Sequence, residues 1–282
     1  MDLHTHSCAS DGTDTPSEIL RKAADIGLDA VALTDHDTVS GIKEFMQAAA
    51  HSPVRAVPGV ELSTQFHGKE LHIIGLFVDP ENDALLEFLA ARRSDRIRRN
   101  REMIFRLREG GYDITEEEVT RFAKGEAAGR PHIARVLIEK GFFSDIKDVF
   151  LKCLRRGTRF YVPRTPVPPE EAIRVIRRAG GIAVWAHPVL AADSRSAMRR
   201  ILRTLVPAGL SALETFYSIY SELQHEAAAA IAREFHLAES GGSDYHGRNQ
   251  PGIQLGCGSG GLRIPADLLI RLEEVRSGLQ AN

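Results

Sequence analysis

Two histidines stand at alternate positions near the start of the chain, in the segment Asp2-Leu3-His4-Thr5-His6. In an extended strand, residues two apart point to the same side, so the imidazoles of His4 and His6 can reach one metal ion together. A lone histidine is more often a hydrogen-bonded core residue, but this paired spacing favours metal binding. Asp11 follows in a Ser-Asp-Gly turn, close enough in sequence to fold back over the same end of the strand.

A second group of titratable residues follows the apolar run that ends at Leu33. Asp35, His36 and Asp37 come directly after this run, and burying them costs free energy unless they pair or bind metal. We interpret His36 as a metal ligand. Asp35 is interpreted as a carboxylate that orients a histidine, and Asp37 as a cap of the next helix.

Other carboxylates and histidines accompany four further apolar runs. Glu61 ends one run, and His72 lies in an apolar segment where an imidazole needs a partner. His187 ends a third run directly before a proline, and Asp244 and His246 follow the last run two residues apart. Barrel enzymes build their active sites at strand ends, so we expect these side chains to gather at one end of a barrel. The remaining histidines lack such neighbours and are interpreted as structural: His51, His67, His225 and His236.

The elements that must position these residues are short apolar runs alternating with helix-like segments. This alternation is typical of βα units around a parallel sheet. We predict an α/β fold, a distorted (β/α)7 TIM-like barrel with an inserted helical subdomain, and the 282 residues are enough chain for it. The predicted strands are residues 2–6, 29–34, 54–62, 71–78, 182–186, 210–216 and 237–240.

Residues 80–165 break this rhythm and contain helix-like segments only, at 84–109, 115–124, 131–140 and 145–154. We therefore expect a catalytic barrel made of residues 1–79 and 166–282. Residues 80–165 would form a helical insertion, placed where it can cover a substrate.

Composition excludes several classes of protein. The net charge of -2 gives no overall attraction to nucleic acid or membranes, so any polyanion site must be a local patch. The three cysteines show no paired spacing, which argues against a disulfide framework and a Cys-x-x-Cys zinc site. No apolar run approaches the ~20 residues that span a bilayer, and the first residues lack signal-peptide features. We expect a cytoplasmic protein without an obligate protein partner.

The ordered motifs resemble the PHP (polymerase and histidinol phosphatase) family. They are D-L-H-T-H-S at 2–7, T-D-H-D at 34–37, G-V-E at 59–61, H-I-I-G-L at 72–76, A-H-P at 186–188 and S-D-Y-H at 243–246. The compact bacterial branch with a helical insertion is most similar. It includes 3′,5′-nucleotide bisphosphate phosphatases and enzymes that trim short RNAs from the 5′ end.

This resemblance implies two or three divalent metal ions and nine ligands. The ligands are His4, His6, Asp11, His36, Glu61, His72, His187, Asp244 and His246. Glu61 would bridge two ions, with His4, His6 and Asp244 completing one site, His72 and His187 a second, and Asp11, His36 and His246 a third. Nitrogen and oxygen ligands suit Mn²⁺, Zn²⁺ or Fe²⁺, and we expect Mn²⁺ first. The hypothesis for catalysis is attack on phosphorus by a metal-bridging hydroxide, without a phospho-enzyme. Asp35 and His132 are candidates for the acid that protonates the leaving group.

Substrate contacts are expected from the insertion, because equivalent segments contact substrate in the resembling branch. Arg130 and His132 lie where a proline starts a helix, whose N-terminus favours anions, and Arg135 follows one turn later. Arg159 stands where relatives often carry lysine, and Tyr161 could stack on a base. For each arginine a solvated helix charge is the simpler alternative, and for the tyrosine it is core packing.

The functional hypothesis is hydrolysis of phosphate esters of nucleotides. The reaction would convert a 3′,5′-nucleotide bisphosphate to a 5′-nucleotide, trim short RNA in the 5′-to-3′ direction, or both. Residues 92–109 hold eight arginines against three acids and could guide such substrates, although a solvated helix face is the simpler interpretation. Alternatives are a phosphatase for a metabolite such as histidinol phosphate, a non-catalytic metal-binding module, and an amide hydrolase.

Overall fold

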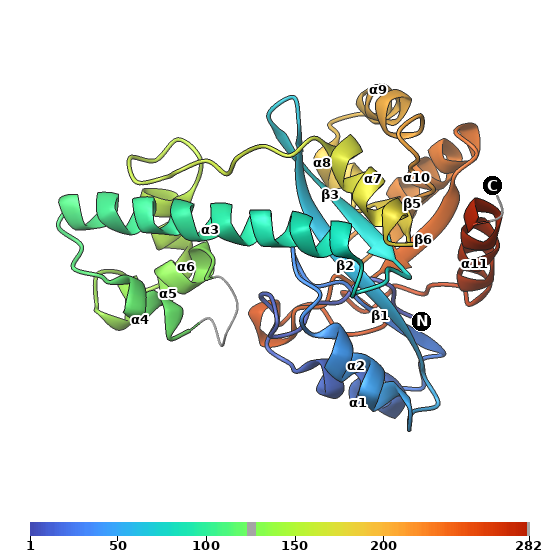
Figure 1. The fold of residues 1–282 in the computed structure, drawn as a ribbon, viewed down its shortest axis with the longest axis horizontal. Helices are drawn as coiled ribbons and strands as arrows, with labels where there is room; N and C mark the ends of the chain where they lie inside the picture. The colour runs from blue at the N-terminus through green and yellow to red at the C-terminus, as the bar shows by residue number, and fades with distance from the viewer. Residues whose placement is uncertain (123–127, 281–282) are drawn as a thin grey trace. The chain divides into compact units, whose positions relative to one another are not determined.

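The computed structural model describes residues 1–122 and 128–280, which form two compact units (Figure 1). The sheet unit comprises residues 1–88 together with the chain from Pro166 onward, and the helical unit comprises residues 89–165. No helix in the described parts of the chain is long and apolar enough to cross a membrane.

The sheet unit is built on one curled sheet of six strands in chain order, which agrees with the predicted mixed α/β fold and is consistent with a distorted barrel. The strands are β1 (Ala30–Leu33), β2 (Arg55–Phe66), β3 (Lys69–Leu76), β4 (Ile182–Trp185), β5 (Ala212–Tyr217) and β6 (Ala238–Gly242). β1 pairs with β2 in parallel, and β4, β5 and β6 are also parallel.

The prediction of an entirely parallel sheet was wrong at β3, which runs antiparallel to both β2 and β4. β2 and β3 form a hairpin closed by His67 and Gly68, with φ of 47° and 81°. Two consecutive positive φ values suit the right-handed twist of a tight hairpin. As a result Glu61 and His72 lie within the paired strands of this hairpin, although Glu61 was predicted to lie at the end of a strand.

The N-terminal segment joins the two ends of the sheet. The amide of Asp2 donates to the carbonyl of Ala30 in β1 (2.9 Å), and the amide of Leu3 donates to the carbonyl of Gly241 in β6 (3.1 Å). Gly242 is required at this contact, because a Cβ on it would lie 2.2 Å from Cβ of His4. The predicted first strand, residues 2–6, is present as this short bridging segment with isolated bridges to both sides.

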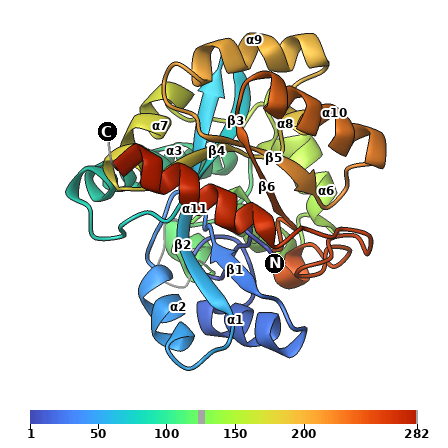
Figure 2. The same cartoon turned by 90° about the vertical axis from the view of Figure 1, so that its right-hand side faces the viewer.

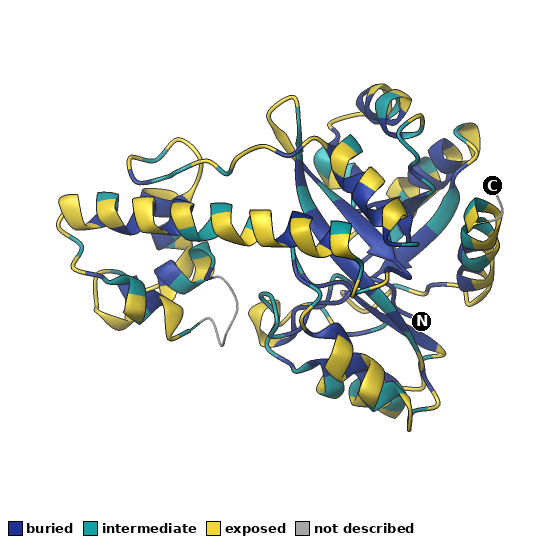
Figure 3. Ribbon diagram, in the orientation of Figure 1, coloured by how far each residue is buried: buried dark blue, intermediate teal, exposed yellow. Residues whose placement is uncertain are grey.

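Helices cover the sheet. They are α1 (Pro16–Asp25), α2 (Ile42–Ala49), α7 (Pro169–Arg178), α8 (Pro188–Ala191), α9 (Arg195–Leu205), α10 (Glu222–Glu234) and α11 (Asp267–Gln280). α1 starts with a capping box in which the Thr15 hydroxyl accepts from the amide of Glu18, as this sequence pattern favours. The strands are mostly buried (Figure 3), and α11 packs Leu268, Leu269 and Leu272 into their core (Figure 2).

The helical unit has its own apolar core, which includes Met103, Leu107, Ile133, Leu137 and Phe160. Its helices are α3, which begins at Asp83 in the sheet unit and ends at Glu109, then α4 (Glu116–Thr120), α5 (Arg130–Glu139) and α6 (Ile146–Val149), followed by a π-helical turn at Phe150–Leu154. These match the predicted helices, except that the helix predicted over 115–124 is shorter. Its expected end at Lys124 lies outside the described residues.

Candidate metal centre

Glu61 lies at the centre of the predicted ligands, and its two carboxylate oxygens contact different histidines. Oε2 lies 3.4 Å from Nε2 of His4, 3.4 Å from Nε2 of His6 and 2.8 Å from Nδ1 of His36. Oε1 lies 3.0 Å from Nδ1 of His72 and 3.2 Å from Nε2 of His187. The side chain of Glu61 is buried in this ring of imidazoles.

Asp244 contacts the histidine pair of the N-terminal segment. Its Oδ1 lies 3.3 Å from Nε2 of His4 and 3.1 Å from Nε2 of His6. Its Oδ2 accepts a hydrogen bond from the hydroxyl of Tyr217 (2.7 Å), at the end of β5. The carboxylate is thereby fixed with one oxygen towards the imidazoles.

Asp11 and His246 form the remaining side of the cluster. Nε2 of His246 lies 3.2 Å from Oδ1 of Asp11, and Nε2 of His36 lies 3.9 Å from Oδ2 of the same carboxylate. The His6 and His246 rings stack with their centroids 4.1 Å apart. One ligand atom from each of these four residues lies within 4.8 Å of the others.

The donor set fits divalent metal ions. Within the described chain, five buried atoms of the cluster make no hydrogen bond: Nε2 of His4, Nδ1 and Nε2 of His6, Nδ1 of His36 and Oε2 of Glu61. Such atoms are costly in a protein interior unless another partner binds them. Besides the four-residue group, His4, His6 and Glu61 form a second possible metal-holding group, and His36, Glu61 and His72 a third. The structure therefore supports a site for more than one metal ion.

The electrostatics of the cluster suit cations. Burial opposes ionisation of Glu61, but His36, His72 and His4 hold the pKa of this carboxyl well below its usual range. Burial lowers the pKa of His6 to about 3, with repulsion from His246 and His36 acting in the same direction. His6 is thus in the neutral state that metal binding requires. Burial acts to lower the pKa of His72 as well, but Glu61 outweighs it and raises that pKa to about 10, so a metal ion would have to displace a proton from this ring.

Glu214 was missed by the sequence analysis. It lies within β5 and is buried; its Oε1 accepts from Nδ1 of His4 (2.9 Å), and its Oε2 accepts from the amide of His187 (2.6 Å). His187 sits in the left-handed region at φ 32°, and this bond helps to hold that turn. A carboxylate among apolar strand residues was the available signal, because it cannot be buried without partners.

Asp2 was also missed, although it starts the first motif. Its buried carboxylate accepts from the amide and hydroxyl of Ser243 and from the amide of Gly256 (2.8 Å). Burial raises the pKa of this carboxyl, while these hydrogen bonds act in the opposite direction. Asp2 ties the N-terminal segment to the chain that carries Asp244 and His246.

Two sequence interpretations are corrected. In the described hydrogen bonds, the carboxylate of Asp35 does not contact a histidine. It accepts hydrogen bonds from the amide and hydroxyl of Ser7 (both 2.7 Å) and from the hydroxyl of Ser10 (2.6 Å). It thus fixes the loop before Asp11. Asp37 does not cap α2, whose first turn has no side-chain cap, and instead accepts from the amide of Ser63 (2.9 Å).

The predicted substrate-binding residues all lie in the helical unit. Arg130 donates to the carbonyl of Leu154 (3.1 Å), and its guanidinium lies 5.8 Å from the ring centre of Tyr161. Nδ1 of His132 accepts from the amide of Gly129 (2.8 Å). The guanidinium groups of the other two predicted residues, Arg135 and Arg159, lie over the rings of Phe122 and Phe160.

Comparisons with known proteins agree with this site. Residues 2–159 match the model of the PHP domain. The chain is 37% identical over 257 residues to the 5′-3′ exoribonuclease Rnm of Escherichia coli K12, covering 90% of this chain and 87% of that protein. It is 34% identical to the 3′,5′-nucleoside bisphosphate phosphatase of Chromobacterium violaceum, covering 91% and 90%.

Solved structures show the same fold. An amidohydrolase from Chromobacterium violaceum, solved with bound sulfate and without metal, superposes with a TM-score of 0.84 at 32% identity. The superposition covers 97% of this chain and 96% of that one.

Proposed function

The chain belongs to the PHP domain family of phosphoesterases, and from this premise we propose that it hydrolyses 3′,5′-nucleotide bisphosphates to 5′-nucleotides and trims short RNA from the 5′ end. The observation that carries the proposal is the convergence of five imidazoles on the two oxygens of Glu61. The relatives named for these two reactions span nearly the whole chain. Both reactions break an ester bond on the 3′ side of a 5′-phosphorylated nucleotide, so one site can serve both.

We assign the metal ions to the nine predicted ligands, with Mn²⁺ as the ion to test first. Divalent ions held there would acidify water and neutralise charge on the phosphoryl oxygens. The ligands are His4, His6, Asp11, His36, Glu61, His72, His187, Asp244 and His246, all of which lie in the sheet unit. Glu61 stays ionised at neutral pH because its pKa is held well below its usual range.

The proposed reaction is a single displacement at phosphorus. The oxygen of water bonds to phosphorus as the bond to the 3′-oxygen breaks, and the 3′-oxygen takes up a proton. From a bisphosphate the products are inorganic phosphate and a 5′-nucleotide. From a diester they are the terminal 5′-nucleotide and a shortened RNA that keeps the phosphate on its 5′ end. His132 can donate a hydrogen bond to the 3′-oxygen, because its Nδ1 accepts from the amide of Gly129 and the hydrogen of the neutral ring is therefore on Nε2. Asp35 is not retained as the leaving-group acid, because Ser7 and Ser10 engage its buried carboxylate.

Recognition of the second phosphate is assigned to Arg130. Its guanidinium is positioned by the carbonyl of Leu154, which ends the π-helical turn, and by the rings of Phe150 and Tyr161. Arg99 lies over the same tyrosine ring, 5.7 Å from its centre. Burial lowers the pKa of Arg99 to about 10, and repulsion from Arg130 acts in the same direction. Two guanidinium groups beside one ring favour an anionic ligand.

The test of the metal assignment is the change Glu61→Gln. An amide has no negative charge to share between two ions, so we expect at least one fewer bound metal per chain and loss of turnover. Metal content would be measured by elemental analysis and turnover by phosphate release, with the exposed Glu226→Gln as control. Near-normal activity of the Glu61→Gln variant would contradict the assignment.

The test of the substrate assignment is Arg130→Ala. We expect a raised KM or lowered kcat for adenosine 3′,5′-bisphosphate, with little change for an aryl phosphate that lacks a second phosphate. Equal losses on both substrates would remove Arg130 from substrate recognition.

A further inference from the structure

The helical unit has a positive formal charge, whereas the rest of the chain has a negative one. Residues 89–165 contain 19 Lys and Arg against 11 Asp and Glu, a formal charge of +8. The remaining residues contain 17 against 27, a formal charge of -10. A positive unit in an acidic chain indicates a local site for a polyanion, which the net charge of the whole chain conceals.

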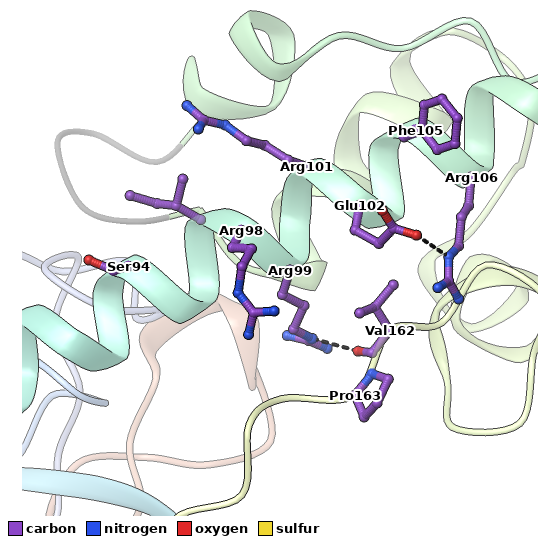
Figure 4. A pocket seen from close by; sticks show the side chains of 10 residues that line it. Ser94, Arg98, Arg99, Arg101, Glu102, Phe105, Arg106, Val162 and Pro163 are labelled. Atoms are coloured by element: carbon purple, nitrogen blue, oxygen red, sulfur yellow. Dashed lines mark hydrogen bonds and ion pairs between the residues drawn. The ribbon is translucent and has the colours of Figure 1, made fainter.

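The positive charge is concentrated along a groove on α3. The groove has a volume of about 880 Å³, and its lining includes Arg98, Arg99, Arg101, Arg106 and the single acid Glu102. In Figure 4, Arg98, Arg99 and Arg106 extend from α3 towards Val162 and Pro163, whereas Arg101 and Phe105 extend from the other side of the helix. All of these residues belong to the helical unit, so the groove is complete within it.

Arg101 and Arg106 are available to an anion, because their carboxylate partners are exposed. Arg98 is itself 73% exposed, but it pairs with Asp95, whose side chain is only 13% exposed. Arg101 pairs with Glu116, and Arg106 pairs with Glu102, with each of these four side chains more than 40% exposed. Exposed pairs of this kind contribute little and exchange readily for another anion. Arg99 is buried and donates to the carbonyl of Val162 (2.7 Å), which does not neutralise its charge.

A second groove on the same helix has the opposite character. It has a volume of about 530 Å³ and is lined by Arg101 and Arg108 but also by Glu109, Glu116 and Glu117. Phosphates would be repelled by three glutamates, so only the first groove suits a nucleic acid. This difference provides a control, since Arg108 lines the second groove and not the first.

Phe105 gives the first groove a feature that simple anion binding does not need. Its ring is 61% exposed, although the opposite face of α3 buries Met103 and Leu107. An exposed aromatic ring next to arginines is the arrangement on which proteins stack the bases of single strands. Arg98, Arg101 and Phe105 lie three and four residues apart and start from neighbouring turns of the helix, with Arg98 directed towards Pro163 and the other two directed away from it (Figure 4).

We propose that this groove binds single-stranded RNA, with phosphates at Arg98 and Arg106 and a base stacked on Phe105. This inference rests on the proposed function and deepens it, because the groove would bind the part of an RNA substrate that extends beyond a single nucleotide. Arg98→Ala with Phe105→Ala removes one phosphate contact and the stacking platform. Phe105→Ala alone breaks no polar contact, so it remains informative if the double variant unfolds.

The first experiment compares kcat/KM of the Mn²⁺-loaded chain on a 5′-phosphorylated eight-nucleotide RNA and on adenosine 3′,5′-bisphosphate. We expect the double variant to lose about tenfold on the RNA, through KM, and nothing on the bisphosphate. Arg108→Ala should match the unsubstituted chain on both. Equal losses on both substrates, or an equal loss in Arg108→Ala, would overturn the groove assignment.

The second experiment measures binding of the same RNA by fluorescence anisotropy in the Glu61→Gln background, so that it does not depend on turnover. We expect about tenfold weaker RNA binding for the double variant. The slope of the logarithm of its binding constant against the logarithm of the salt concentration should be shallower by about one unit, because one phosphate contact is lost. Unchanged RNA binding would overturn the proposal, as would equally tight binding of a polyglutamate peptide, which would indicate an acidic protein partner. If groove-dependent binding is found but the unsubstituted chain hydrolyses neither substrate, the proposed function fails and the groove assignment stands.

Discussion

Glu61 and Glu214 are both buried glutamates, and they differ in what their oxygens contact. Glu61 faces ring nitrogens of five histidines, so it is placed to hold metal. Glu214 accepts hydrogen bonds from Nδ1 of His4 and from the amide of His187, so it fixes two metal ligands in position. A carboxylate behind a ligating histidine sets the tautomer of the ring and strengthens it as a ligand.

Replacing Glu214 by Gln should therefore weaken metal binding without removing a ligand. We expect about 10- to 100-fold lower affinity for Mn²⁺, because His4 loses a charged partner. Calorimetric titration of the metal-free chain measures this directly. The exposed Glu226→Gln is the control, and an affinity equal to that of the unsubstituted chain would show that Glu214 has only a packing role.

Sequence reasoning at the residue scale found the histidines that gather around Glu61 because they occur in short, ordered motifs. It missed Glu214 and Asp2 because a single carboxylate in a strand does not show which side it faces. It assigned Asp35 and Asp37 to the wrong partners, since Ser7, Ser10 and Ser63 are distant in sequence or carry no distinctive pattern.

The N-terminal segment is the element on which the site depends most. It carries His4 and His6, and it is held between β1 and β6 by backbone hydrogen bonds. Gly242 lets the segment approach β6 closely. This contact joins the first motif of the chain to the last.

Gly242→Ala should push the segment away from β6. The added Cβ would lie 2.2 Å from Cβ of His4 and 2.5 Å from its amide nitrogen, so the backbone must shift. We expect the free energy of unfolding to fall by about 2 kcal/mol or more, with a loss of bound metal. Denaturant unfolding measures the first effect and elemental analysis the second.

Gly252→Ala is the matched control, because a Cβ at Gly252 would meet nothing within 4 Å. Equal stability and metal content in the Gly242 and Gly252 variants would contradict the role given to this contact.

A second element-scale contact closes the helical unit. The carboxylate of Asp95 on α3 accepts from the amide of Thr165 (3.0 Å), from the Thr165 hydroxyl and from Arg98. Burial acts to raise the pKa of Asp95, but the hydrogen bonds from Thr165 and Arg98 outweigh it and lower the pKa. Because the folded-state pKa is lowered, the ionised carboxylate stabilises the fold at pH values above its unfolded-state pKa of about 3.9. This stabilisation is lost as the pH falls through the folded-state pKa.

Asp95→Asn should consequently be less stable than the unsubstituted chain by about 1 kcal/mol at pH 7. The difference should stay constant down to about pH 5 and narrow below about pH 4, where the aspartate itself becomes protonated. Urea unfolding at several pH values measures it, with the exposed Asp113→Asn as control. A difference that does not depend on pH would show that the charge of Asp95 has no part in the contact.

Sequence reasoning at the element scale located the strands and the long helix from their apolar patterns. It failed at the β2–β3 hairpin, because His67-Gly68 is not one of the strongest turn signals and the pairing depends on contacts across the sheet. The same limit applies to α4, whose described helix is only Glu116–Thr120.

At the scale of the whole molecule, metal chemistry and positive charge are divided between two units. The sheet unit contains the histidine and carboxylate cluster, and the helical unit contains Arg130 and the groove along α3. The net charge of -2 hides this division. The positive charge of the helical unit suits a ligand with several phosphates.

The measurement that tests the proposed function most directly is phosphate release by the Mn²⁺-loaded chain from adenosine 3′,5′-bisphosphate, AMP and histidinol phosphate, compared side by side. We predict clear preference for the bisphosphate, loss of activity after metal is removed with a chelator, and recovery when Mn²⁺ is restored. Equal or faster turnover of histidinol phosphate would contradict the nucleotide assignment and indicate a metabolite phosphatase. Absence of phosphate release from all three would contradict phosphatase activity itself and favour an amide hydrolase or a non-catalytic metal-binding protein.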